Sequence, residues 1–522
     1  MARISGREDP IAGSRIGRRR LLGYLSALAA GAALRPAVGS ASSEGSTARQ
    51  QSVSSAETEL PDTREGAAQS QKRLLDSCVA RGSWIPSEIP PRTVREAVES
   101  CAAAREAARR GVGAPVTALD RALSGLPLSQ SRLGLNGWPL VEESEDLDLG
   151  NFRFAVSPYT VYAEDGKQRF LLFGNTPLLG SFRGRDYLED VQRRIFDRAV
   201  WAMASGCQGT AVVEFDRPIS PDRVAHMVRV LYDYGVRTIV WGNEPNDPGA
   251  AWRDNLRELV KVFVAAADAR KRYGLDGLEL SLPGMAYFGE GEYLQKLLGT
   301  FNALLPGWSG GSSRYLPFQR VADHYYGPVD GFLQRLAEMR QIMARIGLND
   351  LKFDLGEVGN PTVNTGQAPA SDEQIAVGYI PQITSLAIAS GMVDRLFFYS
   401  ALDPGQEGYS LTGIKDGSLV LRPGYRAFVC MARLLSGISR ISWVETADTM
   451  RVDGARTDGI EFSVVWSKVV GREIWVSLPA GGRVFDAMGS ELPGADPQRL
   501  ALGPRGHPFL AGPARIIVSS RA

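Results

Sequence analysis

The feature that most constrains the fold of this chain is a series of short apolar runs at nearly regular intervals in its second half. Six runs are rich in apolar and β-branched residues, and they read TAVVEF (210–215), RTIVWG (237–242), LELSLPG (278–284), RVADHYY (320–326), KFDLGEVG (352–359) and RLFFYS (395–400). Between them, apolar residues recur at three- and four-residue steps, which is typical of amphipathic helices. Successive strand ends, taken at Glu244, Pro283, His324, Glu357 and Tyr399, are separated by 39, 41, 33 and 42 residues. Strands that alternate with helices at such intervals predict a (β/α)8 TIM barrel, over residues 150–436.

A doubly wound parallel sheet also alternates strands and helices, but the sequence lacks its glycine-rich dinucleotide turn and any Walker-type phosphate loop. The barrel is therefore preferred. Its first third is harder to interpret, because NFRFAV (151–156) and QRFLLF (168–173) lie too close together to hold a full helix between them.

From residue 437 the pattern changes to strands separated by glycine and proline turns. Examples are GIEFSVVWSK and REIWVSLPAG. This pattern predicts a β-sandwich over residues 437–522. Trp466 and Trp475 are interpreted as core residues of that sandwich, with a carbohydrate-binding module as the rival role.

The N-terminal part has three predicted segments. Residues 1–42 set Arg18 to Arg20 before an apolar stretch and then small residues, which predicts a signal peptide similar to twin-arginine export signals. Residues 43–72 are polar and predict a disordered linker. Residues 73–149 show helical patterning and are interpreted as an N-terminal extension or as early barrel structure. We therefore expect a secreted or periplasmic protein, with no stable membrane insertion once the signal is removed.

Composition excludes several classes of function. The 522 residues include 59 Lys and Arg against 58 Asp and Glu, a net charge of +1, so a nucleic-acid partner is not expected. With three histidines and four cysteines and no Cys-x-x-Cys motif, no zinc site and no cofactor is predicted. Cys78 and Cys101 are candidates for a disulfide, with buried thiols as the alternative. The acidic run at 141–150 is interpreted as a solvated loop rather than a calcium site.

Polar and aromatic side chains follow four of the predicted strands. They are Asn243 and Glu244, His324 and Tyr326, Glu357, and Tyr399. In a barrel, the C-terminal strand ends form the active site, so these side chains are expected to lie together. Two carboxylates that face each other across a cleft are what cleavage of a glycosidic bond requires, because one donates a proton to the departing oxygen and the other attacks the anomeric carbon.

These motifs resemble those of retaining glycoside hydrolases of the (β/α)8-barrel clan A, whose catalytic glutamates end strands four and seven. WGNEPND looks like the strand-four Asn-Glu-Pro motif, DLGEVG like the strand-seven nucleophile segment, and DHYYG like the strand-six His-x-Tyr. The resemblance implies that Glu244 is the acid/base and Asn243 the contact to the sugar 2-hydroxyl, while Glu357 is the nucleophile. It makes His324 and Tyr326 supporting residues.

Residues 411–437 (LTGIKDGSLVLRPGYRAFVCMARLLSG) extend the resemblance to the β-xylosidase and α-L-iduronidase group within that clan, with a cellulase-like member as the alternative. The clan often ends strand eight in tryptophan, whereas this chain has FFYSALD, which leaves Tyr399 as a substitute platform. The prediction is an exported retaining glycoside hydrolase acting on a poly- or oligosaccharide. The alternative is a non-catalytic glycan-binding or scaffold protein on the same barrel.

Overall fold

The structure of the chain is a computed structural model. It describes residues 85–86, 118–123, 131–136, 151–162, 168–173 and 208–520, the last range with gaps at 214, 216–217, 234–235, 248–249, 251–252, 287–290, 305–316, 360–377, 400–410, 416–417, 472, 478–481, 493, 495–498 and 504–512. The predicted signal peptide (1–42), the linker (43–72), the acidic run (141–150) and the cysteine pair Cys78 and Cys101 lie outside these residues.

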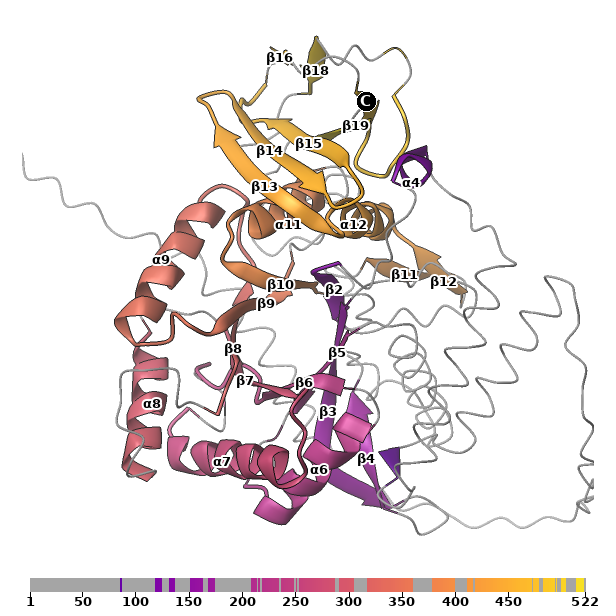
Figure 1. Cartoon of the computed structure of the whole chain (residues 1–522). Coiled ribbons are helices and arrows are strands. Elements are labelled where there is room, and N and C mark those ends of the chain that lie inside the picture. Colours follow the sequence, from indigo (N-terminus) through magenta and orange to yellow (C-terminus); the bar gives the residue numbers. More distant parts are fainter. Residues whose placement is uncertain are drawn as a thin grey trace, which may run out of the picture.

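A closed barrel of eight parallel strands forms the centre of the molecule (Figure 1). The strands are β2 (Leu133–Asn136), β3 (Asn151–Tyr162), β5 (Gln208–Val213), β6 (Val236–Trp241), β7 (Glu279–Met285), β8 (Arg320–Tyr325), β9 (Lys352–Val358) and β10 (Val393–Phe398). Each strand pairs in parallel with the next one along the chain, and β10 pairs in parallel with β2, which closes the ring. The predicted barrel is therefore present.

Two segments of the first third differ in role from the later strands. β2 lies within residues 73–149, so part of that segment is barrel and not an N-terminal extension. β4 (Gln168–Phe173) pairs antiparallel with β3 and lies outside the ring, and β1 (Ile85–Pro86) pairs with β4. The short separation of NFRFAV and QRFLLF is thus explained by an antiparallel hairpin.

Helices pack around the barrel, most of them through one apolar face. They are α6 (Pro221–Asp233), α7 (Leu256–Arg272), α8 (Glu292–Leu304), α9 (Phe332–Arg345), α11 (Ile380–Ala389) and α12 (Pro423–Leu434). By contrast with the others, α11 is buried over almost its whole length. In α7 the buried Leu259, Phe263 and Ala266 recur at four- and three-residue steps and face the strands. Pro423 starts α12, a position where the missing backbone N–H costs nothing. In the part of the chain that is described, no helix is long and apolar enough to cross a membrane.

A buried ionic network fills the barrel interior near the N-terminal ends of the strands. Arg395 of β10 donates from Nη2 to Asp354 Oδ2 of β9 at 2.6 Å. Its Nη1 crosses the barrel to the hydroxyls of Thr210 on β5, at 3.2 Å, and Thr238 on β6, at 3.0 Å. Arg320 of β8 binds the other oxygen of Asp354 at 2.7 Å. Two buried guanidinium groups thus share the Asp354 carboxylate, and Arg320 has two further carboxylate partners. Asp354 and the two threonines join five strands.

The C-terminal region is a second layered unit. A five-stranded antiparallel sheet contains β13 (Ile438–Glu445), β14 (Thr449–Arg456), β15 (Ile460–Ser467), β19 (Arg515–Ser520) and β17 (Arg483–Phe485), in that spatial order. A smaller antiparallel sheet consists of β16 (Ile474–Val476) and β18 (Leu500–Leu502). Alternate residues of the large sheet face opposite sides, since side chains along a strand alternate.

Both faces of the large sheet are covered along its inner strands, whereas the edge strand β13 is largely exposed. Val464 and Trp466 belong to the same apolar core as α11 and α12 of the barrel, whereas Val465 and Ile517 pack with Leu502 of the small sheet. The predicted β-sandwich is therefore present, with barrel helices as a third layer. Trp466 is a core residue as expected. Trp475 is not: its side chain lies on the outer face of the small sheet, is 53% exposed, and has Arg499 over its ring at 5.0 Å.

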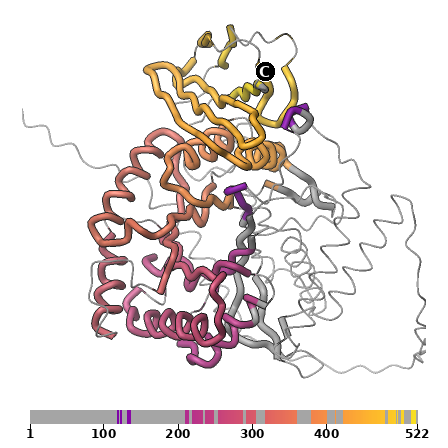
Figure 2. The backbone as a smooth tube through the Cα atoms, viewed as in Figure 1, coloured from indigo at the N-terminus to yellow at the C-terminus, as the bar shows by residue number. Residues whose placement is uncertain are grey.

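A short N-terminal helix joins the barrel and the C-terminal sheet. In Figure 2 the indigo segment of α4 (Ala118–Ala122) lies beside the yellow C-terminal strands, and the Leu119 N–H donates to Gly489 O at 3.0 Å. Arg456 of β14 donates to the backbone oxygens of Arg433 at the end of α12, at 2.5 Å, and of Leu123, at 3.4 Å. These contacts bring three distant parts of the chain into one packed unit.

Removing Asp354 should destabilise the barrel strongly. Asp354→Ala leaves the buried Arg395 without the carboxylate it binds, whereas Arg320 keeps Glu279 and Asp394, and loss of one partner of a buried pair costs about 3–5 kcal/mol. The matched control is Glu258→Ala on α7, which removes an exposed pair with Lys261 and should cost under about 1 kcal/mol. Denaturant unfolding of both variants measures the difference, and equal small losses would contradict the role given to the network.

The two tryptophans of the C-terminal region should respond oppositely to truncation. Trp466 is 4% exposed, and Trp466→Ala should lower the free energy of unfolding by about 3–5 kcal/mol through lost burial and a cavity. Trp475→Ala removes an exposed ring and should change it by about 0.5 kcal/mol or less. Thermal and denaturant unfolding of the pair tests this, and a larger loss for Trp475→Ala would show that the layering is wrong.

Candidate active site

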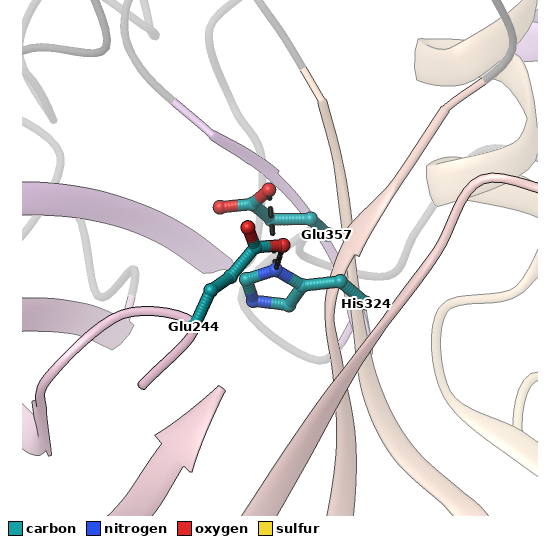
Figure 3. Close-up of side chains that lie close together, drawn as sticks. All are labelled: Glu244, His324 and Glu357. Atoms are coloured by element: carbon teal, nitrogen blue, oxygen red, sulfur yellow. Dashed lines mark hydrogen bonds and ion pairs between the residues drawn. The ribbon is translucent and has the colours of Figure 1, made fainter. Parts of the chain in front are cut away.

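The side chains singled out in the sequence lie at the C-terminal end of the barrel. Glu244 follows β6, the fourth barrel strand, and Glu357 is on β9, the seventh. His324 is on β8 between them, Tyr326 directly follows it, and Tyr399 follows β10. Figure 3 shows Glu244, His324 and Glu357 converging from their separate strands on one point. This end is opposite the ionic network of the barrel interior.

The backbone around Glu244 is held in an unusual conformation. Glu244 has φ of 43°, the left-handed region that non-glycine residues rarely adopt, and Gly242 before it has φ of 89°. The Gly242 N–H donates to Val213 O of β5 at 2.8 Å, and the Glu244 N–H donates to Gly284 O of β7 at 2.8 Å. Ties to the strands on both sides keep this strained turn in place and aim the glutamate into the site.

Residues after Glu244 secure the same turn. The Asp247 N–H donates to Glu244 O at 2.9 Å, which closes a turn over Pro245. Asn246 Oδ1 accepts the N–H of buried Ala286, just beyond β7, at 2.9 Å. Asn243 is half-buried, and its backbone forms a parallel bridge with Gly284. The strand-four motif thus contacts Gly284 of β7 and the residue just beyond that strand.

His324 links the two carboxylates. Its Nδ1 lies 2.8 Å from Glu244 Oε1 and 3.3 Å from Glu357 Oε2 (Figure 3). The side chain of His324 is fully buried, that of Glu357 is 9% exposed, and that of Glu244 is 27% exposed. One nitrogen or oxygen atom of each of the three side chains lies within 4.8 Å of those of the other two. Glu244 is the more accessible carboxylate of the pair.

Tyr326 and Tyr399 form one wall around Glu357. The Tyr326 hydroxyl donates to Glu357 Oε2 at 2.5 Å. Burial, then the neighbouring Glu357 carboxylate, raises the pKa of Tyr326 well above its ordinary value, so the hydroxyl keeps its proton and remains a donor. The Tyr399 ring meets the Tyr326 ring edge-on at 6.0 Å between centroids, and the Tyr399 N–H donates to Val358 O at 2.7 Å. Tyr399 therefore stands beside the pair, at the end of the eighth strand.

Glu244, His324 and Glu357 are also the residue types that bind transition metals, and their ligand atoms are close enough to share one ion. In the present geometry, however, the His324 nitrogen that faces the carboxylates is within hydrogen-bond distance of both. A nitrogen that donates its hydrogen to carboxylate oxygens has no lone pair left for a metal. In the tautomer with its hydrogen on Nδ1, His324 therefore hydrogen-bonds the carboxylates and does not bind a metal through that nitrogen.

Three positions at the site escaped sequence reasoning: Asn246, Gly284 and Gly356. Asn246 belongs to the quoted NEPND stretch, but its partner Ala286 is 40 residues away. Gly284 and Gly356 are glycines late in predicted strands, a signal for a bulge or a close approach of another group. Both lie against the His324 ring.

Loss of the Asn246 acceptor should loosen the turn that carries Glu244. Asn246→Ala leaves the buried Ala286 N–H without this partner, which costs about 1–3 kcal/mol. Asn246→Asp keeps an oxygen at the same place and is the matched control, with a smaller loss expected. Denaturant unfolding of the two variants measures the difference, and an equal loss would mean that this hydrogen bond does not hold the turn.

No protein-family model matches the sequence, and no curated protein matches it significantly. Solved structures do resemble it. A family 39 glycoside hydrolase from the gut symbiont Bacteroides cellulosilyticus WH2 aligns with a TM-score of 0.51 and 15% identity, over 76% of this chain and 82% of that one.

Weaker similarities include the catalytic domain of GH30 xylanase C from Talaromyces cellulolyticus, with a TM-score of 0.44 and 12% identity over 72% of this chain and 90% of that one. The GH51 arabinofuranosidase from Xanthomonas axonopodis pv. citri has a TM-score of 0.42 and 13% identity over 78% and 97%. At these identities the similarity concerns the fold. The chain thus has the fold of the family 39 glycoside hydrolase, a (β/α)8 barrel with antiparallel C-terminal sheets.

Proposed function

We propose that the protein is a retaining glycoside hydrolase that cleaves O-glycosidic bonds of an oligo- or polysaccharide, with Glu357 as nucleophile and Glu244 as acid/base. The observation that carries the proposal is the pairing of these two carboxyl groups at the ends of barrel strands seven and four. Oxygens of the two groups approach within 4.8 Å. Retaining enzymes separate their carboxyl groups by about 5–5.5 Å, whereas inverting enzymes need about 6.5–9.5 Å to admit a water molecule.

The surroundings of the two glutamates support different roles. Glu357 is the more buried, and its Oε2 accepts a hydrogen bond from the Tyr326 hydroxyl and lies 3.3 Å from His324 Nδ1. Donors around a carboxylate stabilise its negative charge and orient the oxygen that attacks. Glu244 is the more exposed, which suits a group that must meet first the departing oxygen and then a water molecule.

In the proposed reaction, a Glu357 oxygen attacks the anomeric carbon while Glu244 donates a proton to the leaving oxygen. This forms a glycosyl ester on Glu357 and releases the first alcohol. A water molecule then gives its proton to Glu244 and its oxygen to the anomeric carbon, which frees Glu357 and restores the protonated Glu244. Asn243 is the proposed contact to the sugar 2-hydroxyl, and Tyr399 the proposed aromatic wall beside the sugar. The proposed site of action is outside the cytoplasm, because the N-terminal sequence resembles a twin-arginine export signal.

Variants of the two glutamates should separate their roles. Glu357→Ala should nearly abolish hydrolysis of an aryl-glycoside found by screening, and azide should restore turnover with product of inverted configuration. Glu244→Ala should slow substrates with poor leaving groups by about 10²–10⁴-fold and activated aryl-glycosides much less, because activated groups need little acid help. Tyr326→Phe should cost less than either, since both carboxylates remain. Rates across a series of leaving groups, with product stereochemistry, give the readout.

The surface variant Glu258→Ala serves as the control and should keep the wild-type rate. If Glu357→Ala, and not Glu244→Ala, showed the strong dependence on the leaving group, the assigned roles would be reversed. Loss of wild-type activity in EDTA would point to a metal centre at Glu244, His324 and Glu357. Binding of glycans without hydrolysis of any of them would favour the non-catalytic alternative.

A further inference from the structure

We propose that Gly284 is a positioning residue of the active site: its missing side chain leaves the space that holds the His324 ring with Nδ1 between Glu244 and Glu357. The catalytic part of this inference rests on the proposed glycosidase function. The structural part, the orientation and tautomer of His324, does not.

The His324 ring lies in a slot between two glycines on the neighbouring strands. A Cβ atom at Gly284 of β7 would lie 2.4 Å from His324 Nε2 and 3.2 Å from both Cδ2 and Cε1. On the other side, a Cβ atom at Gly356 of β9 would lie 3.3 Å from Cδ2 and Nε2. Contacts under about 3 Å do not occur between such atoms, so any side chain at position 284 must displace the ring.

Position 284 requires a glycine because of the space that the His324 ring occupies, and not because of its backbone conformation. Gly284 is absent from the glycines of the described residues that have positive φ, so alanine suits its backbone. The strand pairing is irregular at both sides of the slot: β7 and β8 shift register between Ser281 and Gly284, and β8 and β9 shift between Asp323 and His324. Such irregularities re-aim side chains near functional sites.

The slot also selects one tautomer of His324. Nε2 is buried against Gly284 and has no hydrogen-bond partner among the described residues. Nδ1 faces two carboxylate oxygens, which accept hydrogen bonds. A hydrogen on Nε2 in place of Nδ1 would bury an unpaired donor and set the Nδ1 lone pair against the ionised Glu357 carboxylate, and both are unfavourable. His324 therefore carries its hydrogen on Nδ1 and donates it to Glu244 Oε1, with Glu357 Oε2 3.3 Å from the same nitrogen.

Gly284 also contacts Glu244 directly, through a backbone hydrogen bond. Its carbonyl oxygen accepts the Glu244 N–H at 2.8 Å, the bond that supports the strained backbone of the proposed acid/base. One residue of β7 thus holds the main chain of Glu244 and leaves room for the ring that contacts its side chain. An added methyl group at 284 preserves the first contact and removes the second, so a single substitution isolates the role of the space.

Nitrogen-15 NMR of histidine-labelled full-length protein tests the structural part without any assay. The sequence has only three histidines, His226, His324 and His507, so the His324 signals are assigned by their loss in His324→Ala. We expect a protonated Nδ1 and an unprotonated Nε2 in the wild type. Gly284→Ala should shift both nitrogens of His324 and leave those of His226 and His507 in place. Gly299→Ala on α8, where an added Cβ meets nothing within 4 Å, is the control and should shift none.

Kinetics test the catalytic part through a double-mutant cycle of Gly284→Ala and His324→Ala. Alone, Gly284→Ala should lower kcat by about 10–100-fold, the loss typical of a catalytic group displaced by about 1 Å. In the His324→Ala background the same change should cost less than about twofold, because the ring it displaces is gone and coupled residues are not additive. The pH profile of kcat should change in Gly284→Ala as it does in His324→Ala.

Three results would overturn the proposal: unchanged His324 signals in Gly284→Ala, an Nε2-protonated ring in the wild type, or additive losses in the cycle. If Gly284→Ala does not fold, Gly356→Ala replaces it. Its closest contact is 3.3 Å, so a smaller shift of the same ring is expected, and no shift would count against the slot. A wild type that hydrolyses no glycoside would refute the proposed function, while the NMR result would still decide the orientation of His324.

Discussion

The ion pair between Arg395 and Asp354 is the interaction on which the geometry of the barrel depends most. It joins β10 to β9, and the same guanidinium reaches the hydroxyls of Thr210 and Thr238 across the interior. Arg320 shares the carboxylate from β8. An apolar filling would close the barrel as well, but it would not join specific strands, whereas directional hydrogen bonds from one buried guanidinium specify which strands face each other. Strands four and seven, which carry the two glutamates, are both in this set.

The opposite end of the barrel differs, because it contains a strained backbone and a buried polar atom without a hydrogen bond in the described part of the chain. Glu244 adopts a positive φ, and His324 presents a buried nitrogen that no described residue binds. Neither feature stabilises the fold, and each is held by contacts from neighbouring strands. Such a division, a well-satisfied network at one end and a strained, carboxylate-rich site at the other, is expected where a rigid scaffold supports chemistry. The C-terminal sheets pack on α11 and α12 and so brace the helices that follow the last strands.

Sequence reasoning was most successful where the signal is local. The six later strands and the change to antiparallel sheets follow from periodicity within a few residues. It was less successful where the outcome depends on distant partners. β2 lies in a segment that the sequence predicts only as an extension or early barrel, because four residues carry little periodicity. Its pairing with β10 is what makes it the first barrel strand. Trp475 was interpreted as core from its alternating strand, but it lies on the outer face of the small sheet, which alternation alone does not distinguish from the inner one.

By itself, the sequence determined the type of fold and the place of the two glutamates at strand ends, because a buried strand and the polar residue that ends it are neighbours in the sequence. It also brought His324, Tyr326 and Tyr399 to the same end of a barrel. Only the tertiary structure decided how these groups meet: the contacts of His324 with both carboxylates, the hydrogen bond of Asn246 and the glycine slot join residues 32 or more positions apart. Contacts at such separations depend on strand register and bulges, which shift by single residues and leave no periodic trace in the chain.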